Sequence, residues 1–425
     1  MNFKQNIILI LLISLTTACG GGERIKNYQL SFNKAVITTP ITKKEPLFAQ
    51  DLSVSSNKST LAITNGKKIE LFSRVPTDDV KEWEYKSTIQ GNDDLFNIEM
   101  DADGEFLFIK KSEKDSTWSI YHKQNDIWDD KSKLELDNHE SSYVLNVKKD
   151  WLTLPLKKNN EWHSAIYNKN NLTLSWDADS NTSNTVSALD GYLPISTQIS
   201  TDGKTLATAY LCNKSANKCT KSKIVVYKKD NNNNWEKTQT IEKDMVVKDE
   251  KNFEEYHRNT GSLSVDLSRD GDVLAIQFQS IVKDQKIGLS EVELYRYGAN
   301  KYEFDTQKSL SKLHEPVSEK YTAQSITQID LSEDGEHLAM TVTTIRKLKT
   351  STPDQLVVCI PAKLYVYEYT SNEWKQKTNI NFLPGNNYMH RVSFFEKDKS
   401  LLIGSSLKEL HKNQDIPYIG YLKIK

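Results

Sequence analysis

The cysteines are the residues whose spacing most directly suggests chemistry. Cys212 and Cys219 flank six residues, between one strand expected at 206–211 and another at 223–227. The ends of a hairpin lie close together, and in an oxidising compartment two cysteines at this spacing can form a disulfide. A zinc pair is the alternative, but it needs more ligands, and no nearby His or Cys supplies them. We predict a Cys212–Cys219 disulfide and a buried free thiol at Cys359.

The other reactive residue types form no recognisable catalytic pattern. The sequence contains no Gly-x-Ser-x-Gly elbow and no Walker loop. The histidines are scattered, and none stands in a helical metal pair or beside a nucleophile: His122, His139, His163, His257, His314, His337, His390 and His411. We therefore predict no catalytic residue, no metal site and no cofactor.

One polar position does recur along the chain. Asp266 and Asp330 occupy the same place in two repeated strands, and Gln198 and Glu99 occupy it in two others. A polar position that recurs in several repeats more often forms structural hydrogen bonds than performs catalysis. We interpret this position as structural.

The N-terminus has the features of an export signal. Lys4 supplies a positive charge, and an apolar stretch of nine residues follows, from Ile7 to Leu15. A helix that crosses a bilayer needs about 20 residues, so this stretch is too short for one. The small residues Thr16, Thr17 and Ala18 then precede Cys19.

This segment resembles the lipobox of bacterial lipoproteins, in which the chain is cut before a cysteine that carries a lipid. It departs from the usual pattern at Thr16, where Leu is common, and an ordinary signal peptide is the alternative. The resemblance implies a signal peptide over 1–18, a lipid on Cys19 and a tether over 19–25. It also implies a location in the cell envelope, anchored to a membrane through the lipid. Gly20 follows the cysteine, where Asp would signal inner-membrane retention, and this points to the outer membrane.

The charges of the chain nearly cancel, with 56 Lys and Arg against 57 Asp and Glu. A nucleic-acid-binding protein usually carries a clear basic excess. We therefore expect no nucleic acid among the partners.

The body of the chain is a repeat of β-hairpins. Segments 100–107, 199–207, 265–276 and 329–340 share a strand, an Asp-Gly turn and a second strand. With three weaker copies, the leucine of the second strand recurs as Leu61, Leu107, Leu152, Leu206, Leu274, Leu338 and Leu402. An aliphatic–aromatic pair follows each leucine: Leu71-Phe72, Ile120-Tyr121, Ile166-Tyr167, Val226-Tyr227, Leu294-Tyr295, Val366-Tyr367 and, more loosely, Ile419-Gly420-Tyr421.

A polar turn and a further aromatic residue complete most units, so that each unit is expected to contain four strands. Four-stranded units repeated seven times predict an all-β, seven-bladed β-propeller over 26–425. The Ser-x-Asp-Gly-x-x-Leu-Ala core resembles that of FG-GAP-type and WD-repeat-like bacterial propellers, a resemblance that implies the fold and says little about function. The calcium loops of that family are absent.

The two ends of the chain are expected to meet. The seventh unit ends at Lys425 without a fourth strand of its own. An N-terminal strand, which we place at 27–32, can supply that strand and cover the bare edge of the last blade.

Units four to six carry long segments between their second and third strands, over 212–221, 279–290 and 343–362. Long insertions on one face of a repeat array often mark a binding surface, although surface drift is an equal alternative. We expect a non-enzymatic binding or scaffold module that contacts a protein or an envelope polymer through this face. The alternatives are a hydrolase or lyase with a site at the central channel, and an accessory subunit of an envelope assembly machine.

Overall fold

The structure, a computed structural model, describes residues 36–39, 52–55, 57, 59–65, 67–73, 83–91, 97–110, 118–125, 127–134, 140–141, 145–158, 161–168, 185–187, 189–213, 221–243, 246–247, 263–280, 289–299, 301–304, 323–347, 356–381, 388–394, 400–409 and 414–423. Within these ranges, no helix has the length and apolar character needed to cross a bilayer.

The regular elements of these ranges are β-strands. They are β1 (Val36–Thr39), β2 (Leu52–Val54), β3 (Thr60–Asn65), β4 (Lys68–Ser73), β5 (Glu84–Gln90), β6 (Asn97–Met100), β7 (Phe106–Lys110), β8 (Trp118–Gln124), β9 (Ile127–Leu134), β10 (Glu140–Ser141), β11 (Asn146–Lys148), β12 (Trp151–Lys158), β13 (Glu161–Asn168), β14 (Thr185–Ser187), β15 (Tyr192–Ile199), β16 (Thr205–Asn213), β17 (Ser222–Lys229), β18 (Trp235–Lys243), β19 (Val246–Val247), β20 (Leu263–Leu267), β21 (Val273–Ser280), β22 (Leu289–Gly298), β23 (Lys301–Phe304), β24 (Ala323–Leu331), β25 (His337–Lys347), β26 (Leu356–Thr370), β27 (Glu373–Asn381), β28 (Tyr388–Phe394), β29 (Ser400–Glu409) and β30 (Gln414–Lys423).

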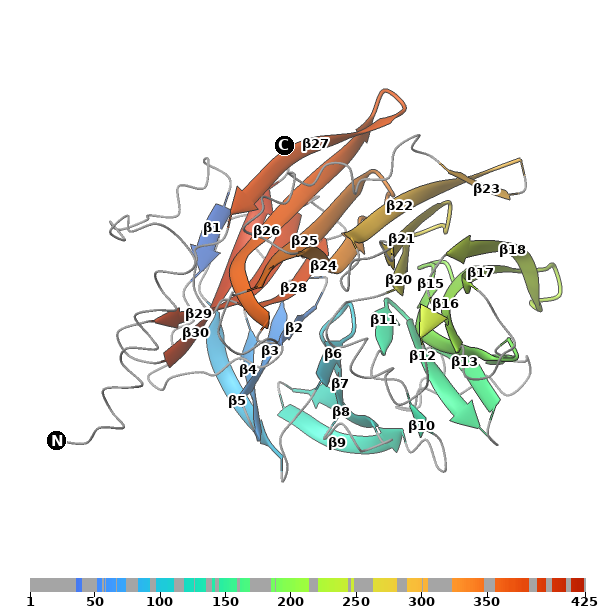
Figure 1. Cartoon of the computed structure of the whole chain (residues 1–425). Coiled ribbons are helices and arrows are strands. Elements are labelled where there is room, and N and C mark those ends of the chain that lie inside the picture. Colours follow the sequence, from blue (N-terminus) through green and yellow to red (C-terminus); the bar gives the residue numbers. More distant parts are fainter. Residues whose placement is uncertain are drawn as a thin grey trace.

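These strands form seven separate sheets among the described residues. We number them along the chain: sheet 1 is β2–β5, sheet 2 is β6–β9, sheet 3 is β10–β14, sheet 4 is β15–β19, sheet 5 is β20–β23, sheet 6 is β24–β27, and sheet 7 is β28–β30 with β1. Figure 1 shows them in chain order around a common centre, with β2, β6, β11, β15, β20, β24 and β28 nearest to it. The fold is therefore all-β and propeller-like.

The ladder register confirms how the sequence repeat was aligned. In sheet 5, Leu274 pairs with Tyr295, and in sheet 6, Leu338 pairs with Tyr367. Every other recurring leucine also pairs with the aromatic residue of its unit: Leu61 with Phe72, Leu107 with Tyr121, Leu152 with Tyr167, Leu206 with Tyr227 and Leu402 with Tyr421. The two sequence motifs are thus neighbours on the second and third strands of each sheet.

The hydrophobic core lies between neighbouring sheets. One cluster joins Ile224 and Val226 of sheet 4 to Leu263 and Val265 of sheet 5. Corresponding clusters join sheets 1 and 2, sheets 2 and 3, sheets 3 and 4, and sheets 5 and 6. Apolar residues on both faces of a strand bury against the sheet on either side, which holds the sheets face to face.

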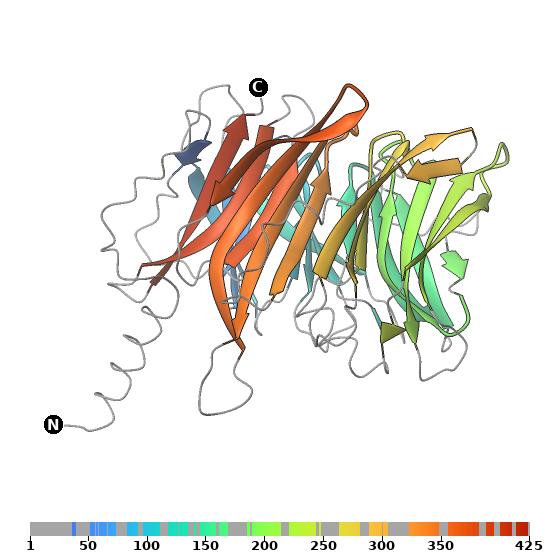
Figure 2. The same ribbon diagram turned by 45° about the horizontal axis from the view of Figure 1, so that its top comes forward.

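Each sheet has two ends with different connections. The turn between the first and second strands defines what we call the turn end, and the connection between the second and third strands emerges at the opposite, insertion end. Figure 2 shows the strands of neighbouring sheets running between the same two ends of the molecule.

At the insertion end, the long segments of sheets 4 to 6 are shorter than expected, because the flanking strands continue into them. In sheet 6 the strands reach Lys347 and resume at Leu356, so much of the segment expected over 343–362 belongs to a β-ribbon. Residues 214–220, 281–288 and 348–355 lie outside the described residues.

The outer strand of sheet 7 comes from the other end of the chain. β1 pairs antiparallel with β30, with Val36 opposite Leu422 and Thr39 opposite Ile419. An N-terminal strand was expected in this place, but β1 begins further along the chain than the segment 27–32 assigned to it, and that segment lies outside the described residues.

Candidate functional site

The turn ends of sheets 4, 5 and 6 share one hydrogen-bonded geometry. In sheet 5, the Ser268 hydroxyl donates to Asp270 Oδ1 at 2.8 Å and accepts the Val273 N–H at 2.9 Å. Asp270 Oδ1 also accepts the N–H of Asp272 at 3.0 Å. The same bonds recur around Ser200 and Ser332. The Ser-x-Asp-Gly motif is therefore a structural turn, in which Ser and Asp side chains satisfy backbone groups.

The turn end of sheet 3 departs from this pattern. Val147 pairs with Leu152 and Lys148 with Trp151, so the turn between β11 and β12 consists of Lys149 and Asp150 alone. In sheet 5, Leu267 pairs with the repeat leucine Leu274, and Ser268 directly follows Leu267, as Lys148 follows Val147. Lys148 therefore occupies the place of the turn serine.

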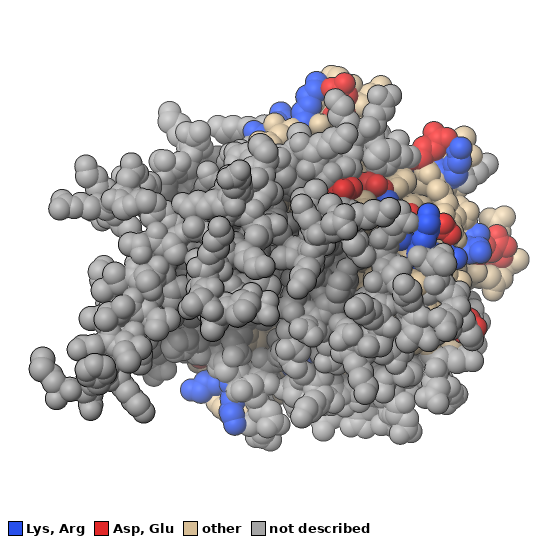
Figure 3. Space-filling view, viewed as in Figure 1, with Lys and Arg blue, Asp and Glu red and all other residues tan. Residues whose placement is uncertain are grey.

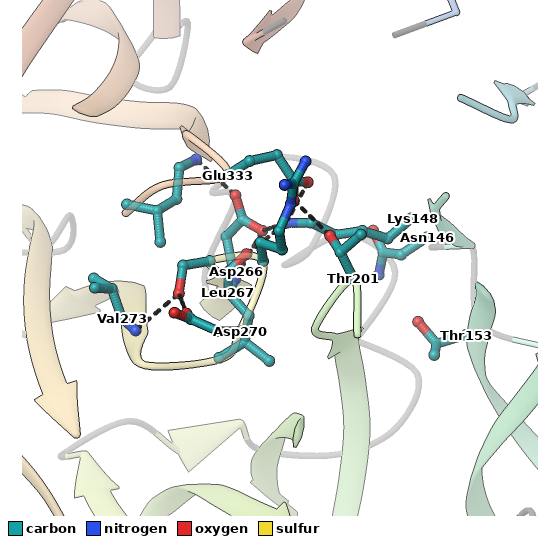
Figure 4. Close-up of polar contacts among 12 residues, drawn as sticks. Asn146, Lys148, Thr153, Thr201, Asp266, Leu267, Asp270, Val273 and Glu333 are labelled. Atoms are coloured by element: carbon teal, nitrogen blue, oxygen red, sulfur yellow. Dashed lines mark hydrogen bonds and ion pairs between the residues drawn. The ribbon is translucent and has the colours of Figure 1, made fainter. Parts of the chain in front are cut away.

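The side chain of Lys148 reaches past sheet 4 into sheet 5, as Figure 4 shows. Its ammonium lies 3.3 Å from Asp266 Oδ1 and donates to the Leu267 carbonyl. A carboxylate oxygen of Glu333 in sheet 6 lies 3.9 Å away. Asp266 is buried, and its two carboxylate oxygens accept the N–H groups of Leu267 at 2.8 Å and Leu331 at 2.7 Å.

Glu333 receives two further contacts at the same place. The Thr201 hydroxyl of sheet 4 donates to Glu333 Oε2 at 2.6 Å, and Arg269 Nε of sheet 5 lies 3.4 Å from the same oxygen. We call Lys148, Thr201, Asp266, Arg269 and Glu333 the hub. Its members come from sheets 3, 4, 5 and 6, and backbone bonds run beside them, from Asp202 N to Arg269 O and from Arg269 N to Glu333 O.

The electrostatics of the hub keep its lysine charged. Burial disfavours the ammonium, yet the negative charges of Asp266, Glu333 and Asp330 outweigh burial and raise the pKa of Lys148 above its ordinary value. A lysine acts as a nucleophile or a general base in its neutral form, which requires a lowered pKa. The hub is therefore suited to holding sheets together rather than to proton transfer.

Cationic side chains also join the outer parts of neighbouring sheets. Lys228 Nζ of sheet 4 lies 3.2 Å from the centroid of the Tyr297 ring in sheet 5. Arg296 of sheet 5 lies 3.6 Å from the centroid of the Tyr369 ring in sheet 6, and its Nη2 donates to the Gly335 carbonyl at 3.3 Å. We call the interface between two neighbouring sheets a seam. These cation–π contacts repeat from one seam to the next, which marks them as structural.

Asp334, Glu336 and His337 offer ligand atoms within 4.8 Å of one another in the turn of sheet 6. His337 is buried, with Nδ1 3.9 Å from Asp334 and Nε2 3.5 Å from Glu368. Asp334 makes the same turn bonds as Asp202 and Asp270, whose turns carry no histidine. The turn accounts for the position of this carboxylate, and we assign no metal to the group.

The structure brings some of the sequence-predicted positions together. Glu99, Gln198, Asp266 and Asp330 all lie next to the repeat-leucine position in the ladders of their sheets, which confirms that they share one position. The bonds of Asp266 agree with a structural role. Sequence reasoning missed Lys148, Thr201, Arg269 and Glu333, and the replacement of the turn serine by a lysine was the one signal that pointed to them.

The cysteines are only partly covered by the described residues. Cys212 is buried at the end of β16 and forms a disulfide. Cys19 and Cys219 lie outside the described residues, so the Cys212–Cys219 pairing and the lipid on Cys19 stay predictions. Cys359 lies on β26, where it pairs with Thr344.

Charges on the surface are mixed where the structure describes them. A small group of basic side chains stands apart at the lower edge of Figure 3, whereas at its upper and right-hand side Lys and Arg side chains lie next to Asp and Glu side chains. Pairs such as Lys86 with Glu84 and Lys301 with Glu303 are examples.

Comparisons with known proteins find similarity in structure but not in sequence. No protein-family model and no curated protein matches the sequence. Among solved structures, hydrazine synthase of Kuenenia stuttgartiensis is 12% identical, with a TM-score of 0.48, over 88% of this chain and 96% of that one. A chain of the mitotic checkpoint complex is 9% identical, with a TM-score of 0.49, over 94% and 96%. A protein of unknown function from Desulfotomaculum acetoxidans is 10% identical, with a TM-score of 0.44, over 80% and 87%.

Proposed function

We propose that the protein is a lipoprotein of the cell envelope, anchored through Cys19, that acts as a binding scaffold. In this proposal the seven sheets are the blades of one closed propeller, and β1 closes it as the outer strand of sheet 7. The pairing of β1 with β30 supports the closure, because it joins the two ends of the chain in one sheet.

The observation that carries the proposal is the state of the hub. It gathers polar side chains from four sheets near the centre, where a propeller enzyme would place its catalytic groups. Yet Lys148 is held protonated by three carboxylates, and Asp266 and Glu333 are engaged by Lys148, Thr201 and backbone N–H groups. This arrangement supports a scaffold over a hydrolase or lyase that works through these residues.

The face we propose for the partner is the insertion end of sheets 4 to 6. The three connections leave from the ends of β16, β21 and β25, in sheets that pack directly against one another. Loops held on a rigid scaffold are the usual site of recognition. The partner we propose is a protein or an envelope polymer.

Site-specific photo-cross-linking in intact cells tests the face. A photo-reactive amino acid replaces Lys221, at the insertion end of sheet 4, and in a matched control it replaces Lys204, at the turn end of the same sheet. Both lysines are exposed. We expect discrete cross-linked adducts from position 221 and none from position 204. Equal or stronger adducts from position 204 would place the partner on the opposite end and refute the proposal.

The anchor is tested separately. Cys19→Ala should abolish labelling with radioactive palmitate and release the protein from the membrane fraction, whereas Cys359→Ala should do neither. A Cys19→Ala protein that still labels with palmitate would rule out the lipoprotein assignment.

A further inference from the structure

Two contacts of the hub join sheets that are not neighbours. Lys148 links sheet 3 to Asp266 in sheet 5, and Thr201 links sheet 4 to Glu333 in sheet 6. The two links overlap, because Lys148 also approaches Glu333 at 3.9 Å. In a ring of blades, contacts between adjacent sheets leave each seam able to tilt by itself, whereas links that pass over a sheet couple two seams at once.

The short turn of sheet 3 is what makes the first link possible. In sheets 4 to 6 a Ser hydroxyl at this position is consumed by its own turn, as in the bonds of Ser200 with Asp202 and Thr205. With a turn of two residues, Lys149 and Asp150, sheet 3 has no such bonds to make. The position is then open to a long side chain, and Lys148 extends from it toward Asp266 and Glu333 (Figure 4).

We propose that Lys148 is a positioning residue, which couples sheets 3 to 6 through the hub so that they move as one unit. Each of these sheets is a continuous ladder of paired strands and is packed on its neighbour by an apolar cluster. Fixing the turn ends therefore fixes the relative positions of the insertion ends of sheets 4 to 6. The inference rests on the proposed function only for what those ends bind, since the positioning itself involves no partner.

Hydrogen exchange at two backbone amides tests the local part. The N–H groups of Leu267 and Leu331 donate to Asp266, whose carboxylate lies beside the Lys148 ammonium. In Lys148→Met the nearby carboxylates lose their counter-charge and repel one another. We expect the exchange of these two amides to become about tenfold faster.

The matched control is Lys149→Met. It removes a charge of the same kind from the next residue along the chain, whose side chain is exposed. It should leave both amides unchanged. Lys148→Arg keeps the charge and should restore most of the protection. Wild-type exchange in Lys148→Met, under conditions where the protein is folded, would overturn the proposal.

Distance measurement tests the coupling across the molecule. Spin labels at positions 221 and 347, at the insertion ends of sheets 4 and 6, are placed in a Cys359→Ser background. We expect Lys148→Met to broaden the distribution of the label-to-label distance at least about twofold, with no change in Lys149→Met. An unchanged distribution together with faster amide exchange would show that Lys148 acts only locally, and the proposal that it couples the sheets would be wrong.

These outcomes are independent of the proposed function. If photo-cross-linking at position 221 fails while the spin-label distribution broadens, the proposed partner face is wrong and the coupling role of Lys148 is supported. If cross-linking succeeds and the distribution does not change, the partner face is supported and the coupling role is wrong. Should Lys148→Met not fold, Lys148→Gln, which removes the charge and keeps a hydrogen-bond donor, gives the same two readouts.

Discussion

Lys228 in the third strand of sheet 4 lies over the ring of Tyr297 in sheet 5, with 3.2 Å between Nζ and the ring centroid. The Tyr302 ring of the same sheet lies 5.9 Å from this ammonium, and the Tyr302 hydroxyl donates to the Gly271 carbonyl. Arg296 repeats the relationship one seam further, with Tyr369 and Trp374. These two interfaces, between sheets 4 and 5 and between sheets 5 and 6, are thus each joined at their outer part by a cation from one sheet and an aromatic pair from the next.

Replacing this cation measures its contribution. Lys228→Met keeps the apolar stem and removes the ammonium, and we expect the free energy of unfolding to fall by about 0.5–2 kcal/mol. Urea denaturation is the measurement, with the exposed Lys204→Met as the control, which should change the unfolding free energy by less than about 0.5 kcal/mol. Equal effects of the two substitutions would show that the contact with Tyr297 contributes nothing specific.

The turn glycine of sheet 4 gives a larger predicted effect. Gly203 has a φ of +71°, and a Cβ added there would overlap the indole ring of Trp151 in sheet 3. Gly203→Ala adds backbone strain of about 1–3 kcal/mol and overpacking of about 1–3 kcal/mol. We expect the free energy of unfolding to fall by several kcal/mol, as measured by chemical denaturation.

Gly298 is the matched control for this substitution. A Cβ at Gly298, at the end of β22, would meet no atom within 4 Å, and its φ is not in the left-handed range. Gly298→Ala should therefore be neutral or stabilising by about 0.4–1 kcal/mol, because it reduces the entropy of the unfolded chain. A Gly203→Ala protein as stable as Gly298→Ala would contradict the packing of the turn against Trp151.

Alkaline stability should depend on a buried tyrosine. Burial raises the pKa of Tyr167 to about 12. The unfolded chain releases this proton near pH 10, so the folded state alone keeps it between pH 10 and 12. The stability that this tyrosine contributes is complete below pH 10 and is lost as the pH rises through 12.

Tyr167→Phe has no such proton to lose. Between pH 8 and pH 11, the unfolding free energy of the wild type should fall by roughly 1.4 kcal/mol more than that of Tyr167→Phe. Other buried tyrosines with a raised pKa, such as Tyr227 and Tyr302, titrate alike in both proteins, so their contribution cancels. Parallel losses in urea denaturation at the two pH values would show that Tyr167 is not protected.

The repeat was predictable from the sequence because its signals are local. The Asp-Gly turn fixes the register of the first and second strands, in which Leu267 pairs with Leu274. The shared position of Gln198 and Asp266 followed from the same alignment. The segment 343–362 was expected to be an insertion, whereas the structure accommodates 360–362 opposite Thr343, in a register shift that leaves both strands paired beyond it.

The hub was not predictable, because its members are far apart in the sequence. Lys148, Thr201, Asp266 and Glu333 stand one to a sheet, and their meeting depends on how the sheets surround a common centre. The lysine in place of a turn serine was visible, but nothing in a single repeat shows where such a side chain will point. The same reason applies to β1: residues 27–32 alternate polar and apolar side chains as a strand does, Val36–Thr39 does not, and only the pairing with β30 identifies Val36–Thr39 as the outer strand.

The pairing of β1 with β30 predicts a marked sensitivity at the N-terminus of the fold. Replacing residues 36–39 with Gly-Ser-Gly-Ser removes the outer strand of sheet 7 and leaves the edge of β30 bare. We expect a lower melting temperature with the transition still cooperative. The same replacement at residues 27–30 is the control and should leave the melting temperature unchanged. If the replacement at 27–30 lowered the melting temperature and the one at 36–39 did not, the outer strand of sheet 7 would be the segment 27–32 that the sequence first suggested.

The disulfide of Cys212 should act locally on the insertion end of sheet 4. Cys212 is buried at the end of β16, where its backbone pairs with Tyr192 of β15 and with Val246 of β19. If Cys219 is its partner, the closed loop is short, and the entropy of closing it stabilises the fold by at most about 2.5 kcal/mol. Reduction should thus speed amide exchange in β19 and at Asn213, while the apolar contacts between sheets 4 and 5 keep β20 protected.

Mass spectrometry of the non-reduced, digested protein should find the Cys212–Cys219 peptide pair, and a pair containing Cys359 instead would overturn the assignment. A protein that unfolds altogether on reduction would show that the bond supports the whole array of sheets rather than one connection.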